Sequence, residues 1–367
     1  MPSYYYLRRN RKRGRIVDGL RRLREQLAAE LPPRSLDDTV RIATWNIREF
    51  DSPAYGPRVD DAYFFIAEIV SRFDLVAIQE VRRDLTALDT LRRHLGPRWR
   101  YLVTDTTEGN PGNDERLAFL YDTRKVTFTG LAGELILPDM PDGDGNLVPV
   151  RQIARTPFTA GFQSGWVKLQ LATVHIVYGE STANSPARAA EVAALAQFLA
   201  DRSREQGSTS GSLVLLGDFN IFKRSDTTMG ALEAAGWRVP DELQRLPSGS
   251  NVPRDKFYDQ IAVLPQAHQF QPTGAAGVFD FYKSVFRLED RDAYAADMGP
   301  ALERTSRGEP RDDAGKTRYY KTYWRTFQMS DHLPMWIDIR ADYAEDYLAG
   351  LRPAPAEEGL GPAAPPA

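Results

Sequence analysis

The chain has 367 residues, of which 42% are hydrophobic and 26% charged, and its net charge is −3. These values are close to globular averages and exclude a collagen, a coiled coil and a mostly disordered chain. The absence of cysteine excludes disulfides, thiolate metal sites and cysteine catalysis. No run of 18 apolar residues is present that would predict a transmembrane helix.

Residues 1–38 form a basic extension that we expect to be helical. Nine Lys and Arg residues face three acids within the first 30 residues. Because these charges interrupt any apolar core, the segment does not resemble a secretory signal, and we expect a cytoplasmic protein. A helical apolar spacing precedes Pro32 and Pro33. Such a helix either docks on the domain with its arginines solvated or serves as an arm for nucleic acid or an anionic surface.

Residues 39–341 alternate short β-rich runs with helical patterns, and neither a repeat nor a linker divides them. Several runs are apolar without alternation, which implies strands buried on both faces in an α/β layered architecture. Strands are predicted at residues 39–45, 74–78, 117–121, 167–174, 212–216, 258–264 and 334–339, and helices at 60–72, 85–95 and 186–204. Residues 342–367 end in a Pro- and Ala-rich run and are predicted to be a disordered tail.

Polar and ionisable residues stand at the ends of five predicted strands. The N-terminus of an antiparallel strand lies beside the C-terminus of its neighbour, so these groups are expected to gather at one edge of the sheets. They are Asn46, Gln79-Glu80, His175, Asp218-Phe219-Asn220 and Ser330-Asp331-His332.

The composition of this cluster predicts phosphodiester hydrolysis. Its carboxylate and amide oxygens are hard ligands, which favour Mg²⁺, with Mn²⁺ or Ca²⁺ as alternatives, over Zn²⁺. A cation would neutralise phosphate charge, while one histidine deprotonates water and the other protonates the leaving oxygen. Each motif alone is typical of a turn; their joint arrangement favours a site.

The order of these motifs resembles that of the endonuclease/exonuclease/phosphatase superfamily over about residues 40–341. The resemblance implies a four-layer sandwich of two packed, mostly antiparallel sheets flanked by helices. Further motifs are similar to those of its deoxyribonuclease I branch: Gln79-Glu80-Val81-Arg82, Glu115-Arg116, Arg155 before Pro157, Tyr258-Asp259 and Phe279-Asp280-Phe281.

The resemblance also implies roles for individual residues. Asn46 and Glu80 would bind the divalent cation, with Asp331 nearby. Arg82 and Arg155 would contact substrate phosphates or the minor groove.

The same resemblance implies that His175 pairs with Glu115 and that His332 pairs with Asp259. The two histidines would serve as general base and general acid, in an order that the sequence leaves open. Asp218, together with Asn220, would orient the phosphate and the attacking water.

Residues 113 and 316–325 depart from the branch. Asn113 stands where the branch has a DNA-stacking Tyr, and the connection holding residues 316–325 is longer than expected. That segment carries four cations and four aromatics without an acid. It is typical of nucleic-acid contact, but a structural lid, an extra hairpin and a lipid-facing loop stay open.

Three other features are expected to be structural. His94 and His268 are predicted to be solvated, in a helix and a loop respectively. Residues 139–146 are predicted to form a turn, with a structural Ca²⁺ site as the alternative.

The resulting hypothesis is a metal-dependent phosphodiesterase, and specifically a monomeric endonuclease that acts on DNA and does not contact membranes. A first alternative keeps the same centre and acts on a lipid, inositol or small-molecule phosphoester. The two arginines and the basic aromatic segment favour nucleic acid, and the sequence does not predict the exposed apolar hairpin expected of a lipid-cleaving enzyme. A second alternative is a binding module without activity.

Overall fold

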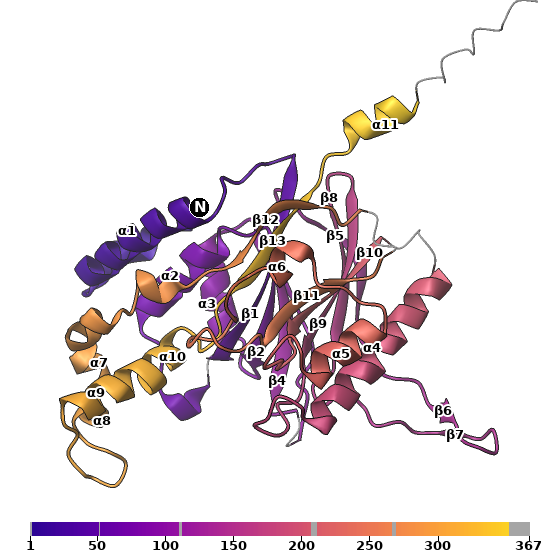
Figure 1. The fold of residues 1–367 in the computed structure, drawn as a ribbon. Coiled ribbons are helices and arrows are strands. Elements are labelled where there is room, and N and C mark those ends of the chain that lie inside the picture. Colours follow the sequence, from indigo (N-terminus) through magenta and orange to yellow (C-terminus); the bar gives the residue numbers. More distant parts are fainter. Residues whose placement is uncertain (1, 51, 110–111, 207–210, 266–268, 352–367) are drawn as a thin grey trace, which may run out of the picture.

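The computed structural model describes residues 2–50, 52–109, 112–206, 211–265 and 269–351. Two β-sheets pack face to face with helices on their outer sides (Figure 1). One sheet contains, in spatial order, β12 (Pro272–Val278), β13 (Met335–Arg340), β1 (Thr39–Phe50), β2 (Leu75–Arg82), β4 (Glu115–Asp122) and β3 (Trp99–Val103). The other contains β11 (Asp259–Val263), β10 (Ser212–Asp218), β9 (Val167–His175), β8 (Phe158–Ser164) and β5 (Thr127–Glu134).

Each sheet has one parallel pair, β1 with β2 and β9 with β10, and its other neighbours are antiparallel. The predicted four-layer sandwich of mostly antiparallel sheets is therefore confirmed. All seven predicted strands are present. Four strands of these two sheets were not predicted: β3, β5, β8 and β12. The burial patterns of β5 and β12 explain two of these misses, because both lie at sheet edges, where β5 is largely exposed and β12 is only partly buried.

The helices form the two outer layers. In Figure 1, α1 (Arg13–Glu30), α2 (Asp60–Val70) and α3 (Thr86–Leu95) lie on one side, and α4 (Pro186–Gln206) and α5 (Thr227–Ala234) on the other. Alternate residues of β1 enter two cores: Ile42 packs with the second sheet, whereas Trp45 packs with α1, α2 and α3. Because successive side chains of a strand point to opposite faces, β1 packs against the second sheet on one face and against the helices on the other.

The basic N-terminal segment forms α1, which docks on the domain. Its apolar face, which includes Ile16, Leu23 and Leu27, is buried, and each such side chain contributes about 1.5–3 kcal/mol. Arg15 donates to Asp61 of α2 at 2.7 Å. The docked interpretation of this helix is confirmed, while the division of the chain at residues 38 and 341 stays a prediction.

Two predictions about side chains and segments are wrong. His94 is buried rather than solvated, because its ring packs against Phe64 with centroids 4.4 Å apart. Burial lowers the pKa of His94 to about 4. Residues 316–325 form neither a loop nor a hairpin: they lie within α9 (Asp313–Tyr319), a π-helical turn (Tyr320–Trp324) and the start of α10 (Arg325–Gln328).

The strands β6 (Met140–Pro141) and β7 (Leu147–Val148) form a projecting hairpin (Figure 1). Its turn is the predicted one, because the Asp142 carboxylate accepts the backbone N–H of Asn146 at 2.9 Å. The sequence did not predict this hairpin, whose large aliphatic side chains are exposed; it carries no aromatic residue, so the aliphatic-aromatic hairpin expected of a lipid-cleaving enzyme is not seen here.

The remaining short helices are α6 (Asp241–Gln244), α7 (Ala295–Met298), α8 (Pro300–Glu303) and α11 (Ala344–Gly350). Helix α11 lies inside residues 342–367, which were predicted to be disordered, so that prediction is wrong for the beginning of the tail. The rest of that tail from residue 352, and His268, lie outside the described residues. Among the helices that the structure describes, all are too short or too polar to cross a membrane.

Candidate active site

The strand-end motifs meet at one end of the two sheets, as the sequence predicts. In the second sheet, Asp218 of β10 is in register with His175 of β9 on one side and with Asp259 of β11 on the other. In the first sheet, Asn46 of β1 is in register with Gln79 of β2. The strand register therefore places these side chains side by side.

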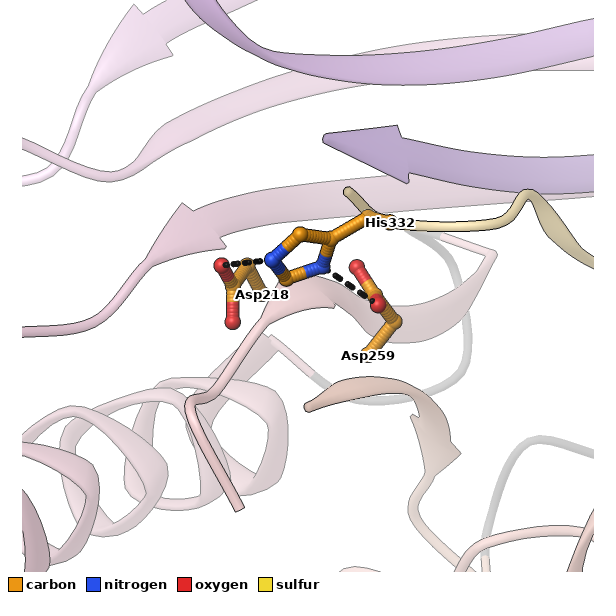
Figure 2. Close-up of side chains that lie close together, drawn as sticks. All are labelled: Asp218, Asp259 and His332. Atoms are coloured by element: carbon orange, nitrogen blue, oxygen red, sulfur yellow. Dashed lines mark hydrogen bonds and ion pairs between the residues drawn. The ribbon is translucent and has the colours of Figure 1, made fainter. Parts of the chain in front are cut away.

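Asp218 lies at the centre of the cluster. Its Oδ2 is 3.6 Å from Nε2 of His175 and 3.7 Å from Nε2 of His332. The opposite ring nitrogens are held by buried carboxylates: His175 Nδ1 by Glu115 at 2.7 Å and His332 Nδ1 by Asp259 at 2.9 Å. Figure 2 shows the His332 ring between Asp218 and Asp259. Both expected pairs are present, and each leaves an Nε2 facing the same oxygen.

The carboxylates favour the charged form of each imidazole. Burial lowers the pKa of His332, but the carboxylates of Asp259 and Asp218 outweigh it and raise that pKa well above 6.5. For His175, burial and the Arg155 cation lower the pKa, and the Glu115 carboxylate outweighs both and raises it. Burial alone would raise the pKa of Glu115, yet the neighbouring His175 and Arg155 lower it to about 2.

Asn46 and Glu80 have the properties of cation ligands. Asn46 donates through Nδ2 to Glu80 at 2.8 Å and to Asp218 at 3.0 Å, while its buried Oδ1 has no hydrogen-bond partner among the described residues. Burial and the nearby carboxylates of Glu115 and Asp331 raise the pKa of Glu80. An unpaired amide oxygen beside crowded carboxylates fits a hard divalent cation.

The backbone aims Glu80 into the site. The pairing of β2 with β4 shifts register between Ile78 and Val81, and Glu80 has a φ of +61° at this bulge. Bulges redirect side chains, and positive φ is unfavourable for a non-glycine residue, so both features are typical of functional sites. The Glu49 N–H donates to Oε2 of Glu80 at 2.7 Å and fixes the carboxylate.

A second group of residues could also hold a metal ion. Ligand atoms of Asp218, Asp259 and His332 lie within 4.8 Å of one another. The His332 proton already neutralises part of this negative charge, because the ring pairs with both carboxylates. A cation here would compete with that proton, whereas the Asn46–Glu80 position offers oxygen ligands alone.

The other predicted residues line the same site. Arg155 Nε lies 3.0 Å from Glu115, and Arg82 Nη1 lies 3.4 Å from Glu49. Asn220 has its N–H on Asp218 and its Nδ2 on the Ile176 carbonyl, both at 2.8 Å. Asp331 is more open: its side chain is 44% exposed and lies 3.7 Å from Arg48 Nε.

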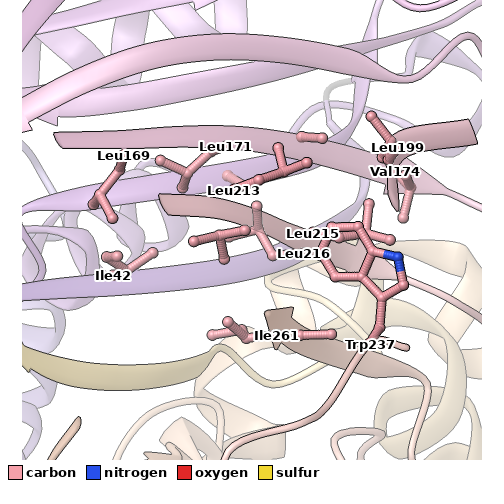
Figure 3. Close-up of a cluster of buried hydrophobic side chains, with 14 of the residues drawn as sticks. Ile42, Leu169, Leu171, Val174, Leu199, Leu213, Leu215, Leu216, Trp237 and Ile261 are labelled. Carbon is pink, nitrogen blue, oxygen red and sulfur yellow. The ribbon is translucent and has the colours of Figure 1, made fainter. Parts of the chain in front are cut away.

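Packing beneath the cluster fixes the strand ends. Val174 and Leu216, which precede the site residues of β9 and β10, lie in the buried core (Figure 3). Gly217 stands between Leu216 and Asp218 and opposite Val174 of β9. It has a φ of +141°, and a Cβ there would collide with the Val174 backbone carbonyl. Only glycine lets β10 approach β9 this closely. Ser330 ties the segment before β13 to the end of β1, since its Oγ donates to the Asn46 carbonyl at 2.6 Å and accepts the His332 N–H.

Two contacts in the site were not predicted. Asn113 donates through Nδ2 to Glu115 at 2.6 Å. Its spacing of two residues from Glu115 was a usable signal, because such residues can share a face. Tyr258 stacks on the His332 ring with centroids 5.3 Å apart. No sequence pattern indicated that contact, which depends on how β11 and the segment before β13 meet.

Comparison with known proteins places this arrangement in a family. Residues 43–336 match the Endonuclease/Exonuclease/phosphatase family. The chain belongs to this family. It is therefore a phosphoesterase of the endonuclease/exonuclease/phosphatase type, with a buried Asp and His group that could hold a metal ion.

Relatives within the family include deoxyribonucleases. The chain is 32% identical over 259 residues to a deoxyribonuclease of Thioalkalivibrio sp. (strain K90mix), which covers 68% of this chain and 64% of that relative. The chain thus spans less than two thirds of that relative's length. It is 24% identical to deoxyribonuclease-1 of Rattus norvegicus, over 73% of this chain and 92% of the relative.

A solved structure supports the fold alone. A functionally unknown conserved protein from Enterococcus faecalis V583 is 17% identical and aligns with a TM-score of 0.50, covering 81% of this chain and 98% of its own.

Proposed function

We propose that this phosphoesterase is a divalent-metal-dependent endonuclease that hydrolyses DNA. The observation that carries the proposal is the convergence of two carboxylate-held imidazoles, His175 and His332, on Asp218. Phosphodiester hydrolysis needs one proton taken from water and one given to the leaving oxygen, and two imidazoles can supply both transfers. The similarity to deoxyribonucleases supports DNA as the substrate.

Asn46 and Glu80 would hold the cation, with Asp331 nearby. When bound there, the cation supplies charge neutralisation for a phosphate oxygen. Arg82 stands beside Glu49 and Arg155 beside Glu115, and both would bind the phosphates that flank the reacting one.

Proton transfer would take place at the two Nε2 atoms. Glu115 and Asp259 keep each ring proton on Nδ1 and stabilise the imidazolium, so the neutral ring accepts a proton at Nε2 and the charged ring donates one from Nε2. Asp218 would accept a hydrogen bond from the attacking water and orient it, and Asn220 fixes the Asp218 carboxylate through its N–H while its Nδ2 donates to the Ile176 carbonyl.

The decisive experiment is plasmid nicking by the purified protein with Mg²⁺, compared with EDTA. His175→Ala and His332→Ala should each lower the rate about 10²–10⁴-fold. His94→Ala is a matched control, because this buried histidine lies outside the site. It should lower the melting temperature and leave nicking unchanged. Wild-type nicking rates in both site variants would refute the assignment.

A second candidate is hydrolysis of a lipid or small-molecule phosphoester at the same centre. The exposed Met140, Leu147 and Val148 of the β6–β7 hairpin favour it, because a projecting apolar hairpin suits a lipid surface. Intact plasmid, together with metal-dependent cleavage of small phosphoesters, would select this candidate. DNA binding without any hydrolysis would instead indicate a binding module.

A further inference from the structure

The two segments that the sequence marks as basic or aromatic meet at one cleft outside the metal site. This cleft has a volume of about 790 Å³. Residues of the N-terminal extension form one wall and residues of α9 and the π-helical turn form another; the lining includes Tyr6, Arg9, Arg11, Tyr55, Tyr319 and Trp324.

The cleft carries cations that are available to a ligand. Arg9 and Arg11 are exposed, and their side chains form no ion pair among the described residues. The acids of the cleft already have partners. Asp60 accepts from Asn10 at 2.7 Å, and Asp297 is paired with Arg15 at 2.9 Å and with Lys12. Asn10 is neutral, so Asp60 keeps its charge, but Arg9 and Arg11 together outweigh it. The charge left for a ligand is therefore positive, which suits phosphates.

A row of aromatic rings connects the cleft to the candidate active site. Tyr319 stacks on Tyr323 at 5.6 Å between centroids, Tyr323 contacts Phe327 at 4.9 Å, and Tyr55 stacks on Phe327 at 3.8 Å. The guanidinium of Arg48 lies 3.8 Å from the Phe327 centroid and 3.7 Å from Asp331. The row thus runs without interruption from the cleft to a residue beside the cation ligands.

Two rings of this row are open to solvent. Tyr55 is 41% exposed and Tyr323 is 43% exposed, although neighbouring aromatic residues such as Tyr320 are buried. Exposed rings flanked by unpaired cations are suited to stacking on unpaired bases while the cations bind the backbone. Bases in a duplex are already stacked and offer no faces to such rings.

We infer that the cleft and the aromatic row bind a single-stranded stretch of DNA and lead it to the active site. The inference rests on the proposed endonuclease function and specifies the form of its substrate. The N-terminal extension then contributes directly to substrate binding, through Arg9 and Arg11, while its helix α1 stays docked.

The test is the affinity for a labelled 20-nucleotide oligothymidylate and for a 20-base-pair duplex, measured by fluorescence anisotropy in EDTA so that hydrolysis does not intervene. Tyr55→Ala/Tyr323→Ala should weaken single-strand binding about 5- to 150-fold for each base that loses a stacking partner. Tyr347→Ala is the matched control, because it removes another exposed tyrosine, which lies on α11 and is 56% exposed. It should leave the affinity unchanged.

A second variant tests the charges and does not disturb aromatic packing. Arg11→Gln should reduce the slope of log affinity against log salt by about 0.7 for the single strand. Arg238→Gln is its control, since Arg238 is also exposed but pairs through its backbone with Val263, at the far end of β11 from Asp259. A slope for Arg11→Gln that equals the slopes of Arg238→Gln and of wild type would count against the cleft as a phosphate site.

Single-strand affinity equal to wild type in both Tyr55→Ala/Tyr323→Ala and Arg11→Gln would overturn the inference, and so would a wild-type protein that binds only duplex. Plasmid nicking is measured in parallel to separate the two proposals. If the wild-type protein nicks plasmid but the variants bind single strands as tightly as wild type, the endonuclease assignment stands and the proposed single-strand site is refuted. If the wild-type protein does not nick plasmid, the endonuclease assignment is refuted. The single-strand affinities of wild type and variants then still show whether the cleft binds single-stranded DNA.

Discussion

Replacing Glu115 by Gln tests the pairing on which the proposed chemistry depends. The Glu115 carboxylate is 2% exposed and contacts His175 at 2.7 Å, Arg155 at 3.0 Å and Asn113 at 2.6 Å. Gln has nearly the same shape, so the substitution removes the charge and keeps the packing. We therefore expect an electrostatic effect with little change in fold.

The size of the effect on stability follows from the pKa. The neighbouring cations lower the pKa of Glu115 from 4.5 to about 2. At about 1.36 kcal/mol for each pKa unit, this difference corresponds to roughly 3 kcal/mol of stabilisation at pH 7. A lowered carboxyl pKa stabilises the fold above pH 4.5, and that contribution is lost as the pH falls towards 2. The stability gap between wild type and Glu115→Gln should therefore shrink over that range.

The effect on activity comes through His175. Without the Glu115 charge, the pKa of His175 should fall, which moves the corresponding limb of the pH–rate profile to lower pH. The rate should drop about 10²–10⁴-fold if this histidine transfers a proton. Glu108→Gln is the control, because it removes a carboxylate that is 76% exposed and pairs only with Arg83 at 3.2 Å among the described residues.

Two measurements decide the matter: urea unfolding at several pH values in EDTA, and the pH–rate profile of plasmid nicking. A Glu115→Gln enzyme with the wild-type rate and an unshifted profile would refute the role assigned to the pair. A stability gap that stays constant down to pH 2 would refute the electrostatic account.

Three further perturbations probe the cation position, the strand packing and the substrate. Asn46→Ala should weaken Mg²⁺ activation at least about tenfold, measured by metal titration of nicking; an unchanged titration would move the cation to the Asp218, Asp259 and His332 group. Gly217→Ala should cost about 1–3 kcal/mol or more in urea unfolding, because its Cβ collides with the Val174 backbone; wild-type stability would contradict the close approach of β9 and β10. The cleavage rate on DNA should fall as salt rises, whereas a rate independent of salt would favour a small substrate.

Much of the candidate site could be predicted because it lies at strand ends. Polar residues that directly follow apolar runs, such as Asn46, His175 and Asp218, mark where strands leave the core. Hydrogen bonding between neighbouring strands brings the ends within each sheet together, and packing of the two sheets brings Asn46 to Asp218. The geometry around Glu80 could not be predicted in the same way, since it depends on a bulge and a positive φ that the sequence does not signal.

The sequence by itself determined the layered fold and the amphipathic character of α1, although it left the docking of that helix open. Both follow from apolar periodicity, which specifies which faces must leave water whatever their partners are. The same local pattern could not place His94, whose burial depends on Phe64 of another helix.

Only the tertiary structure decided what the basic and aromatic segments do. Residues 316–325 look uniformly suited to nucleic acid in sequence, yet Tyr320 and Trp324 pack into the core while Tyr323 stays exposed. Which ring faces solvent depends on the helical phase and on the elements that cover it, and neither is encoded by composition. The tertiary structure alone places Arg9, Arg11 and Tyr55 beside this helix, because such contacts join segments hundreds of residues apart.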